Sequence, residues 1–504
     1  MSISIDQRLR VRFGWHTVAV FAWNTANSWM VVGATMAVPL LCGGNYGLFC
    51  AVFAAVAIMT IIHMGYMELA SAFPSAGGQF RIVYKVFPRS CRFASFLTGW
   101  FTIYYFAAAI ASCGWFMAKM VLQLVSLWHP DYAPSVWHAM LIHLLLCAIA
   151  LISSTRFPTS IKFLDVFTFG LSVCGFLTSL ILAAVGQTSW WKSGGFRNTS
   201  GWPDGWAMII AITSSLAAFS GLDAPAHLAR EIRDPWFMVP NAIGCAGSLS
   251  AMAAVGWAIV LGLGITDIDS VAQAELPILE VYKQTSEAVP NPKALVTFWA
   301  VLYIVVFYNM LLNLFISSGR VIWSFAKCRG LETSHLTSLD WGSPLRASAL
   351  MFGLQIPAIF LFYIPGFTHA SLANLSVFFL NITLALPQAA LFFRGRGRLT
   401  SKRSGFRSYG YAINAASTLL VAFFSVTLLF PTSVPATGRN MNYLVVVVAV
   451  LVLLVPLRWS YFGYNKIFRP QNKEQEEGQE LEETHVQRET HVWQDTQEAQ
   501  SEMV

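Results

Sequence analysis

Charged residues are scarce in this chain. Of its 504 residues, 11% are Asp, Glu, Lys or Arg, whereas 56% are hydrophobic. A soluble protein of this size needs many more charges to cover its surface. No Asp, Glu, Lys or Arg occurs between Phe13 and Met67, which leaves room for two apolar spans joined by a short turn. The composition therefore excludes a soluble protein and predicts one that is integrated in the lipid bilayer.

Closely spaced cysteine pairs are missing as well. The eight cysteines are scattered, mostly inside apolar runs, and lack the short spacings of zinc or redox motifs. We interpret them as small packing residues. His227 and Glu231 share a helical face at a spacing of four, but no third ligand accompanies them. The sequence thus predicts neither a metal site nor a cofactor.

The apolar runs predict an all-α fold of about twelve transmembrane helices. Their centres lie near residues 29, 57, 108, 146, 174, 215, 252, 308, 356, 380, 420 and 450. Of the 32 Lys and Arg residues, 26 fall in the termini and in alternate loops, which the positive-inside rule assigns to the cytoplasm. We expect both termini to be cytoplasmic, in a multi-pass protein of the plasma membrane. This topology accounts for the net charge of +7 without a nucleic-acid partner.

Composition divides the chain into three parts: a short cytoplasmic N-terminus (1–13), a membrane domain (14–463) and an acidic tail (464–504). The tail is rich in Gln and acidic residues and poor in large apolar ones, so we expect it to be disordered. Between spans seven and eight, a long acidic loop contains a short predicted helix at 276–279. Asn198 begins a glycosylation pattern in a loop that is predicted to lie outside.

Two spans contain residues that suit a break in the middle of a helix, at 26–29 in the first span and 219–225 in the sixth. Gly221 can end a helix in a left-handed conformation, Asp223 can cap the next helix, and Pro225 fits its first turn. Inside a bilayer, an unwound stretch survives only where it lines a cavity. A matched pair of interrupted helices therefore indicates the midplane site of a transporter.

The predicted breaks can hold both ends of an amino acid. Free N–H groups at a helix start suit a carboxylate, and free carbonyls at a helix end suit an ammonium group. A kink filled by a neighbouring side chain is the alternative. For Asp223, three roles stay open: balancing a cationic substrate, carrying a proton, or capping its helix.

Aromatic and amide side chains near these breaks have two interpretations each. One set of aromatic residues could form a gate or a cation-binding cage, or it could serve ordinary packing. The members of this set are Trp29, Trp100, Tyr104, Tyr105 and Phe219. Asn309 and Asn313 lie four apart in span eight, where they either face the cavity or form interhelical hydrogen bonds.

Four ordered segments resemble a known superfamily. They are Asn27-Ser28-Trp29; Gly43-Gly44 followed by residues 68–80; residues 219–232; and Ser317-Ser318-Gly319-Arg320 followed by Phe325-Ala326-Lys327. With these segments the chain resembles the amino acid–polyamine–organocation superfamily, especially the fungal permeases for amino acids, 4-aminobutyrate and choline.

The resemblance implies a fold like that of the bacterial leucine transporter, in which five helices are repeated in inverted orientation and two more are added. Substrate would be held by the broken first and sixth helices. The residues implied at the site are Asn27, Ser28, Trp29, Phe219, Ser220, Gly221, Leu222 and Asp223, to which we add Tyr104 and Asn309. Gating or structural roles would fall to Glu68, Gly77, Gly78 and Arg320, with the two glycines permitting a tight path near the gate.

We therefore expect a secondary transporter that moves a small amino acid or amine by alternating access. A choline carrier is the nearest alternative, and a non-transporting nutrient sensor or an intramembrane enzyme are distant ones. Candidates for an enzyme, such as His63 and Asp165, are scattered over different spans. Coupling to protons is possible, although the lysine that some proton-coupled relatives carry in span five is missing between Val166 and Gly186.

Overall fold

The computed structural model describes residues 13–87, 92–157, 160–185, 195–287, 290–332, 334–340, 343–364, 366–397, 399, 406, 409–438, 441–462 and 468. Across these ranges all regular elements are helices, and β-pairing is limited to two isolated bridges. The predicted all-α class is therefore confirmed. The predictions for the N-terminus and the acidic tail concern stretches that lie almost wholly outside the described residues.

The described α-helices follow one another along the chain. They are α1 (Trp15–Ala26), α2 (Ser28–Thr35), α3 (Ala37–Ala72), α4 (Gln79–Val86), α5 (Arg92–Trp128), α6 (Val136–Arg156), α7 (Ser160–Val185), α9 (Asp204–Ser215), α10 (Ala224–His227), α11 (Pro235–Gly264), α12 (Ile268–Gln273), α13 (Pro277–Ser286), α14 (Pro292–Lys327), α15 (Leu345–Phe360), α16 (His369–Arg394), α17 (Tyr409–Thr427) and α18 (Leu444–Tyr461). Four of the 3₁₀ segments are η2 (Leu216–Phe219), η3 (Ala229–Glu231), η4 (Ser334–Thr337) and η5 (Leu361–Tyr363).

Within the described ranges, eleven helices are long and apolar enough to cross a membrane. The first apolar span is not among them because Asn27, at φ 38° and ψ 50°, divides it into α1 and α2. Further on, Gly44 takes φ 63° and ψ −155° inside α3, which marks the turn from the first span to the second. With the divided first span the total is twelve, as the sequence predicts.

The sixth span is interrupted too. Helix α9 tightens into η2, after which Ser220 is extended and Gly221 takes φ +95°. The chain then resumes as the single turn α10, and η3 follows one residue later. Breaks in the first and sixth spans agree with the expected five-plus-five arrangement. Between Ala224 and Glu231 the helical path is divided at Leu228.

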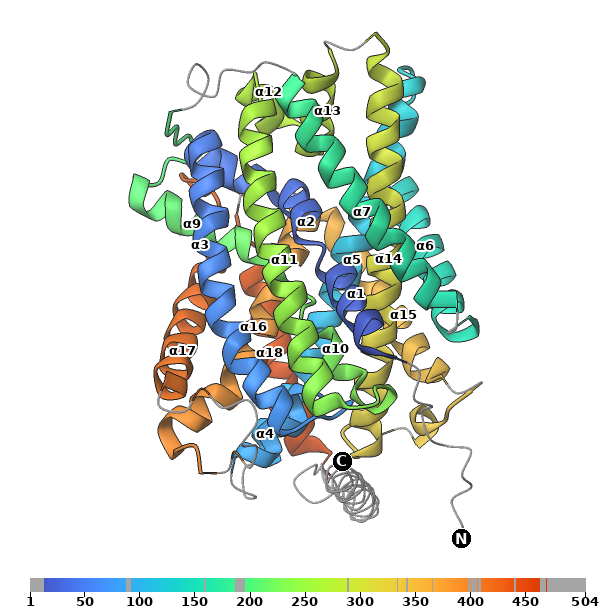
Figure 1. Cartoon of the computed structure of the whole chain (residues 1–504), viewed down its shortest axis with the longest axis vertical. Helices are drawn as coiled ribbons and strands as arrows, with labels where there is room; N and C mark the ends of the chain where they lie inside the picture. The colour runs from blue at the N-terminus through green and yellow to red at the C-terminus, as the bar shows by residue number, and fades with distance from the viewer. Residues whose placement is uncertain are drawn as a thin grey trace, which may run out of the picture.

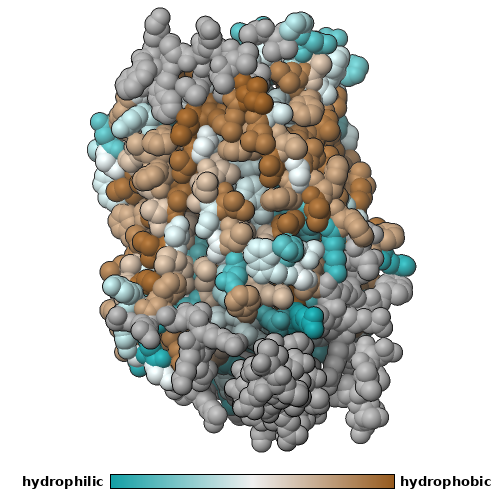
Figure 2. Space-filling model, viewed as in Figure 1, coloured by the Kyte–Doolittle hydropathy of each residue, from teal (hydrophilic) through white to brown (hydrophobic). Residues whose placement is uncertain are grey.

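Long helices surround the two broken spans. In Figure 1, α1 and α2 lie near the centre of the view, between α11 and α14, and α3 runs along α9 and α11. Hydrophobic side chains cover much of the face shown in Figure 2. Large apolar groups such as Phe163 and Leu419 are exposed by 79% and 71%, as expected for residues that contact lipid.

The loop between α11 and α14 forms α12 and α13 at one end of the molecule, and α4 lies toward the other end (Figure 1). The predicted helix at 276–279 is confirmed, and it continues to Ser286. Its side chains Ile278, Val281 and Tyr282 are buried against the bundle. This loop therefore packs onto the transmembrane helices.

Candidate functional site

The two interrupted spans meet at their breaks. A Cβ atom at Gly221 would lie 2.8 Å from the carbonyl oxygen of Thr25, two residues before Asn27. Side chains at both breaks, including Asn27, Ser28 and Asp223, are buried. The absence of a side chain at Gly221 thus allows the backbones of the two breaks to touch in an enclosed place.

Polar groups at this junction are only partly satisfied. Asn27 Oδ1 accepts a hydrogen bond of 3.3 Å from the Ser172 hydroxyl of α7. Asn27 Nδ2 and the hydroxyls of Ser28 and Ser220 are buried without a hydrogen-bond partner. A buried polar group left unpaired costs about 1–3 kcal/mol. These groups are therefore suited to bind a polar solute at the breaks.

Asp223 connects three parts of the molecule. Its Oδ2 atom accepts hydrogen bonds from Gln79 Nε2 at 2.6 Å and His227 Nε2 at 3.4 Å, and its Oδ1 atom accepts one from the Tyr105 hydroxyl at 3.1 Å. Gln79 begins α4, and Tyr105 belongs to α5. The carboxylate thus joins the broken sixth span to the segment after α3 and to the third span.

Of the three roles left open for Asp223, capping of α10 is not the one that the structure shows, since the side chain makes no capping hydrogen bond. The N–H of Ala224 already donates to the Gly221 carbonyl oxygen, and Pro225 has no N–H. The carboxylate turns instead to donors from other spans. Local sequence shows the capping pattern but does not show those competing donors.

The two glycines that precede α4 bring the chain close to the sixth span. Gly78 takes φ +52°, and a Cβ atom there would lie 2.5 Å from His227 Cε1. At Gly77, a Cβ atom would meet the Phe80 ring at 2.7 Å. Residues with side chains do not fit either position without displacing these neighbours.

The aromatic side chains named in the sequence analysis lie in different surroundings. Trp29 donates its indole N–H to Ser172 Oγ at 2.9 Å and packs edge-on against Trp257, with ring centroids 5.1 Å apart. Tyr104 packs against Phe379 of α16, at 5.4 Å. Because the Tyr105 hydroxyl donates to Asp223, Tyr105 and not Tyr104 reaches the break in the sixth span.

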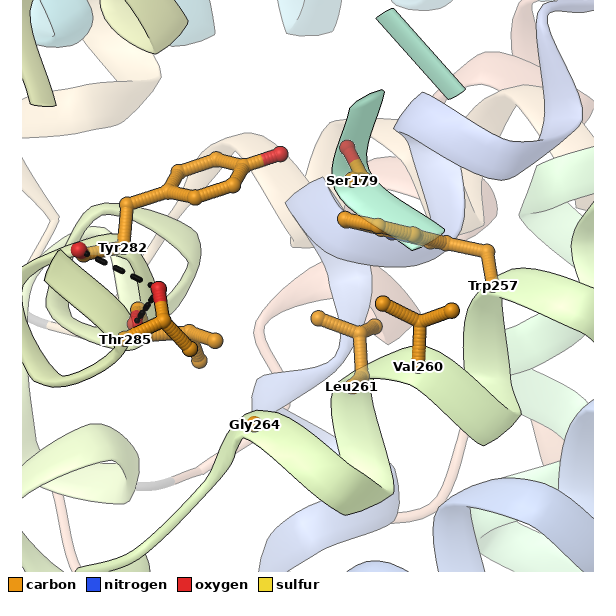
Figure 3. A pocket seen from close by; sticks show the side chains of 8 residues that line it. Ser179, Trp257, Val260, Leu261, Gly264, Tyr282 and Thr285 are labelled. Carbon is orange, nitrogen blue, oxygen red and sulfur yellow. Dashed lines mark hydrogen bonds between the residues drawn. The ribbon is translucent and has the colours of Figure 1, made fainter. Parts of the chain in front are cut away.

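Beside Trp257 lies a small cavity of about 20 Å³ between α7, α11 and α13. Figure 3 shows the side chains that line it: Ser179, Trp257, Val260, Leu261, Gly264, Val281, Tyr282 and Thr285. Its volume is about that needed for one water molecule. Because Trp257 also contacts Trp29, this cavity lies one aromatic ring away from the first break.

Asn309 and Asn313 form interhelical hydrogen bonds, the second of the two interpretations of their spacing. Their amide groups donate to Asp165 Oδ1 of α7 at 2.8 and 2.9 Å. Asn24 of α1 donates to the same oxygen at 3.2 Å. From the sequence, Asp165 is only a scattered acid, and its role as the partner of these asparagines is missed, although the spacing of Asn309 and Asn313 indicates a polar partner opposite α14.

Ion pairs join segments toward both ends of the molecule. The Arg320 guanidinium of α14 donates to Glu231 of η3 at 2.6 and 3.3 Å, and both side chains are buried. Glu68 accepts hydrogen bonds from Arg396 and from the Phe406 N–H. Beside α12, Lys119 pairs with Glu275 at 2.5 Å. Glu68 and Arg320 therefore both hold neighbouring segments together.

Asn198 lies in a compact turn. Its amide nitrogen donates to the Trp202 carbonyl oxygen at 2.6 Å and to Asp204 at 2.9 Å, and its Oδ1 atom accepts from the Ser200 hydroxyl. Ser200 is buried.

In the described part of the chain, no cluster of three or more His, Cys, Asp or Glu residues is arranged to hold a metal ion.

Comparison with known proteins identifies the family. A family model described as amino acid permease matches residues 13–452. The chain belongs to the amino acid permease family. Superfamily membership, which the four segments indicate, is thereby confirmed, and this permease is a multi-pass membrane transporter and not an enzyme.

Curated relatives of the permease include fungal transporters. A choline transporter of Saccharomyces cerevisiae is 26% identical over 94% of this chain and 85% of its own length. A putative amino acid/polyamine transporter of Macrophomina phaseolina is 25% identical over 84% of this chain and 96% of its own. A swainsonine transporter of Arthroderma benhamiae is 22% identical over 87% of this chain and 88% of its own length.

Proposed function

We propose that this permease is a secondary active transporter that carries a small amino acid or amine, such as 4-aminobutyrate, across the plasma membrane by alternating access. The observation that carries the proposal is the contact between the two breaks at Gly221 and Thr25. Unwound backbone at membrane depth persists where it is buried in protein or lines a cavity, and paired breaks of this kind form the substrate sites of many transporters. The buried, unpaired groups of Asn27 and Ser28 provide hydrogen bonds for such a solute.

The substrate site in this proposal consists of side chains and backbone at the two breaks. Its residues are Asn27, Ser28, Trp29, Phe219, Ser220, Gly221 and Leu222. Tyr105 replaces Tyr104 in the site because its hydroxyl reaches Asp223. Asn309 is assigned to the neighbouring cluster around Asp165. Asp223 then acts mainly at the gate, since three donors from other segments already occupy its carboxylate.

Choline is the second candidate substrate. The similarity to the Saccharomyces choline transporter favours it, and so does the aromatic group around Trp29. Phe176, Trp257 and Tyr303 pack edge-on against this indole, with ring centroids 5.1 to 6.2 Å away. A quaternary ammonium group binds to aromatic faces and needs no site for a carboxylate.

Counterflow in proteoliposomes tests the substrate class without any ion gradient. Vesicles preloaded with 4-aminobutyrate, neutral amino acids or choline are given the same labelled compound outside. We expect exchange of an amino acid or amine, and competition by its close analogues. Saturable exchange of choline alone would replace the leading proposal with the second. Exchange of none of these compounds would overturn both.

We also propose that a proton moves with the substrate. Two buried carboxylates, Asp165 and Asp223, lie within membrane spans, where ionisable groups are costly and usually functional. An imposed pH gradient, acidic outside, should drive accumulation above the equilibrium level. Equal accumulation with and without the gradient would contradict proton coupling while leaving the substrate assignment intact.

The proposed orientation places both termini in the cytoplasm and Asn198 outside. Glycosidase treatment should increase the gel mobility of the wild-type protein but not that of Asn198→Gln. The sugar is attached to the Asn198 amide nitrogen, which here donates hydrogen bonds to Trp202 and Asp204. These bonds must be absent when the sugar is attached. A mobility that glycosidase does not change in either protein would remove this support for the orientation.

A further inference from the structure

Asp165 is a buried carboxylate that receives hydrogen bonds from three spans. Its side chain is fully buried in α7, within the membrane span Ile161–Ile181. The Oδ1 atom accepts amide hydrogen bonds from Asn24 at 3.2 Å, Asn309 at 2.8 Å and Asn313 at 2.9 Å. Asn24 also donates to the Asp165 carbonyl oxygen, at 2.7 Å. Thus α1, α7 and α14 are held together at one acid.

Among the described residues, no cationic side chain is bonded to Asp165. Its side-chain partners in the described chain are the three neutral amides. Helix α11, which also packs against α7, has no acidic or basic residue, and α1 has only His16 near its start. On α14, the guanidinium of Arg320 is already paired with Glu231. Lys162 of α7 has its amine over the Phe13 ring, 5.4 Å from the centroid.

Opposite effects act on this carboxylate. Three N–H donors on one oxygen favour its ionised form, whereas complete burial without a cation favours the neutral form. The Oδ2 atom has no hydrogen-bond partner, and the amide oxygens of Asn24, Asn309 and Asn313 have none either. A proton on Oδ2 would therefore find acceptors in the same cluster. The site can hold a carboxylate or a carboxylic acid without a change of neighbours.

We propose that Asp165 is the group that takes up and releases the co-transported proton. This inference rests on the proposed function and names the proton site within it. Asn24 lies in the last turn of α1, three positions before the break residue Asn27. Hydrogen bonds to a carboxylate are about twice as strong as those between neutral groups. Protonation of Asp165 therefore loosens α1 from α7 and α14 next to the substrate site.

Exchange and accumulation are measured on the same proteoliposomes. Wild-type protein should exchange substrate without gradients and accumulate it when the outside is acidic. Asp165→Asn should keep the exchange, because its amide oxygen still accepts a hydrogen bond, but lose the accumulation. Accumulation by the variant to the wild-type level would overturn the proposal. So would wild-type accumulation that needs a sodium gradient instead, whereas a wild-type protein without exchange would overturn the proposed function itself.

A second variant tests the site even if Asp165→Asn does not fold. Asn313→Leu removes one donor that stabilises the ionised carboxylate. The pH of half-maximal uptake should therefore rise, by about one unit for a hydrogen bond to a charged group. Asn414→Leu is the matched control, because Asn414 is equally buried but belongs to α17. An identical pH midpoint in both variants and the wild type would contradict the role of Asp165.

Discussion

Gly78 and Gly221 determine how closely the broken sixth span approaches its neighbours. Both have positive φ angles, and a Cβ atom at either would overlap another segment: the ring of His227 for Gly78 and the Thr25 carbonyl for Gly221. The two obstacles differ. A ring can turn aside, but a backbone carbonyl inside a packed junction cannot. Gly221 should therefore tolerate substitution less well than Gly78.

We predict that Gly221→Val nearly abolishes transport. The new side chain combines a strained φ of +95° with a contact of 2.8 Å to the Thr25 oxygen, which separates the two breaks. Counterflow per molecule of purified protein measures the effect. Gly353→Val is the control, because its Cβ atom would have no neighbour within 4 Å. Equal losses in both variants would show that the junction has no special role.

The neighbouring tyrosines of α5 offer a matched comparison. Tyr105→Phe leaves Asp223 Oδ1 without its donor inside the protein, which costs about 1–3 kcal/mol. Tyr104→Phe removes a hydroxyl on the side of the helix that packs against Phe379. We expect reduced thermal stability and transport for the first variant and values near the wild type for the second. A reversed order would contradict the placement of Tyr105 at the break.

At the scale of elements, short helical pieces depend on partners from elsewhere. The segments α10 and η3 have only four and three residues, too few to be stable alone. Asp223 fixes α10 through Gln79 and Tyr105, and Glu231 fixes η3 through Arg320. The inner half of the sixth span is thus held by side-chain contacts at each end.

We predict that Arg320→Ala destabilises the protein by about 3 kcal/mol, because it leaves the buried Glu231 carboxylate without its partner. The double variant Arg320→Met, Glu231→Leu should recover most of this loss, since no unpaired charge remains. Thermal unfolding in detergent measures both. A double variant no more stable than Arg320→Ala would show that the pair contributes more than mutual neutralisation.

Sequence patterns predict the elements better than their partners. Asn27, Gly221 and Pro225 mark the breaks because their backbone preferences are local. By contrast, Asp223 bonds to Gln79 and Tyr105, 144 and 118 positions away. Helix-capping rules describe near neighbours only, so they assign this acid to the wrong partner. The cluster at Asp165 is hidden for the same reason, because its donors come from the first and eighth spans.

In the part of the chain that the structure describes, both breaks are enclosed. Residues at both breaks are buried, Lys119 pairs with Glu275 near α12, and Glu68 pairs with Arg396 toward the opposite end, where α4 lies. In the proposed alternating access, each side opens in turn while the other stays closed. On that proposal, the structure described here is one member of a set of states, and substrate binding would change the populations of these states.

We predict that a cysteine at Ser28 becomes reactive only when the transporter opens. The variant Ser28→Cys is made in a background without the eight native cysteines. Because Ser28 has 1% of its surface exposed in this structure, a water-soluble thiol reagent can reach the new cysteine only in an open state. Substrate should slow the labelling by occupying the site. Ser417→Cys, equally buried in α17, should stay unlabelled throughout. Labelling of Ser28→Cys at a rate that substrate does not change would separate this position from the transport path.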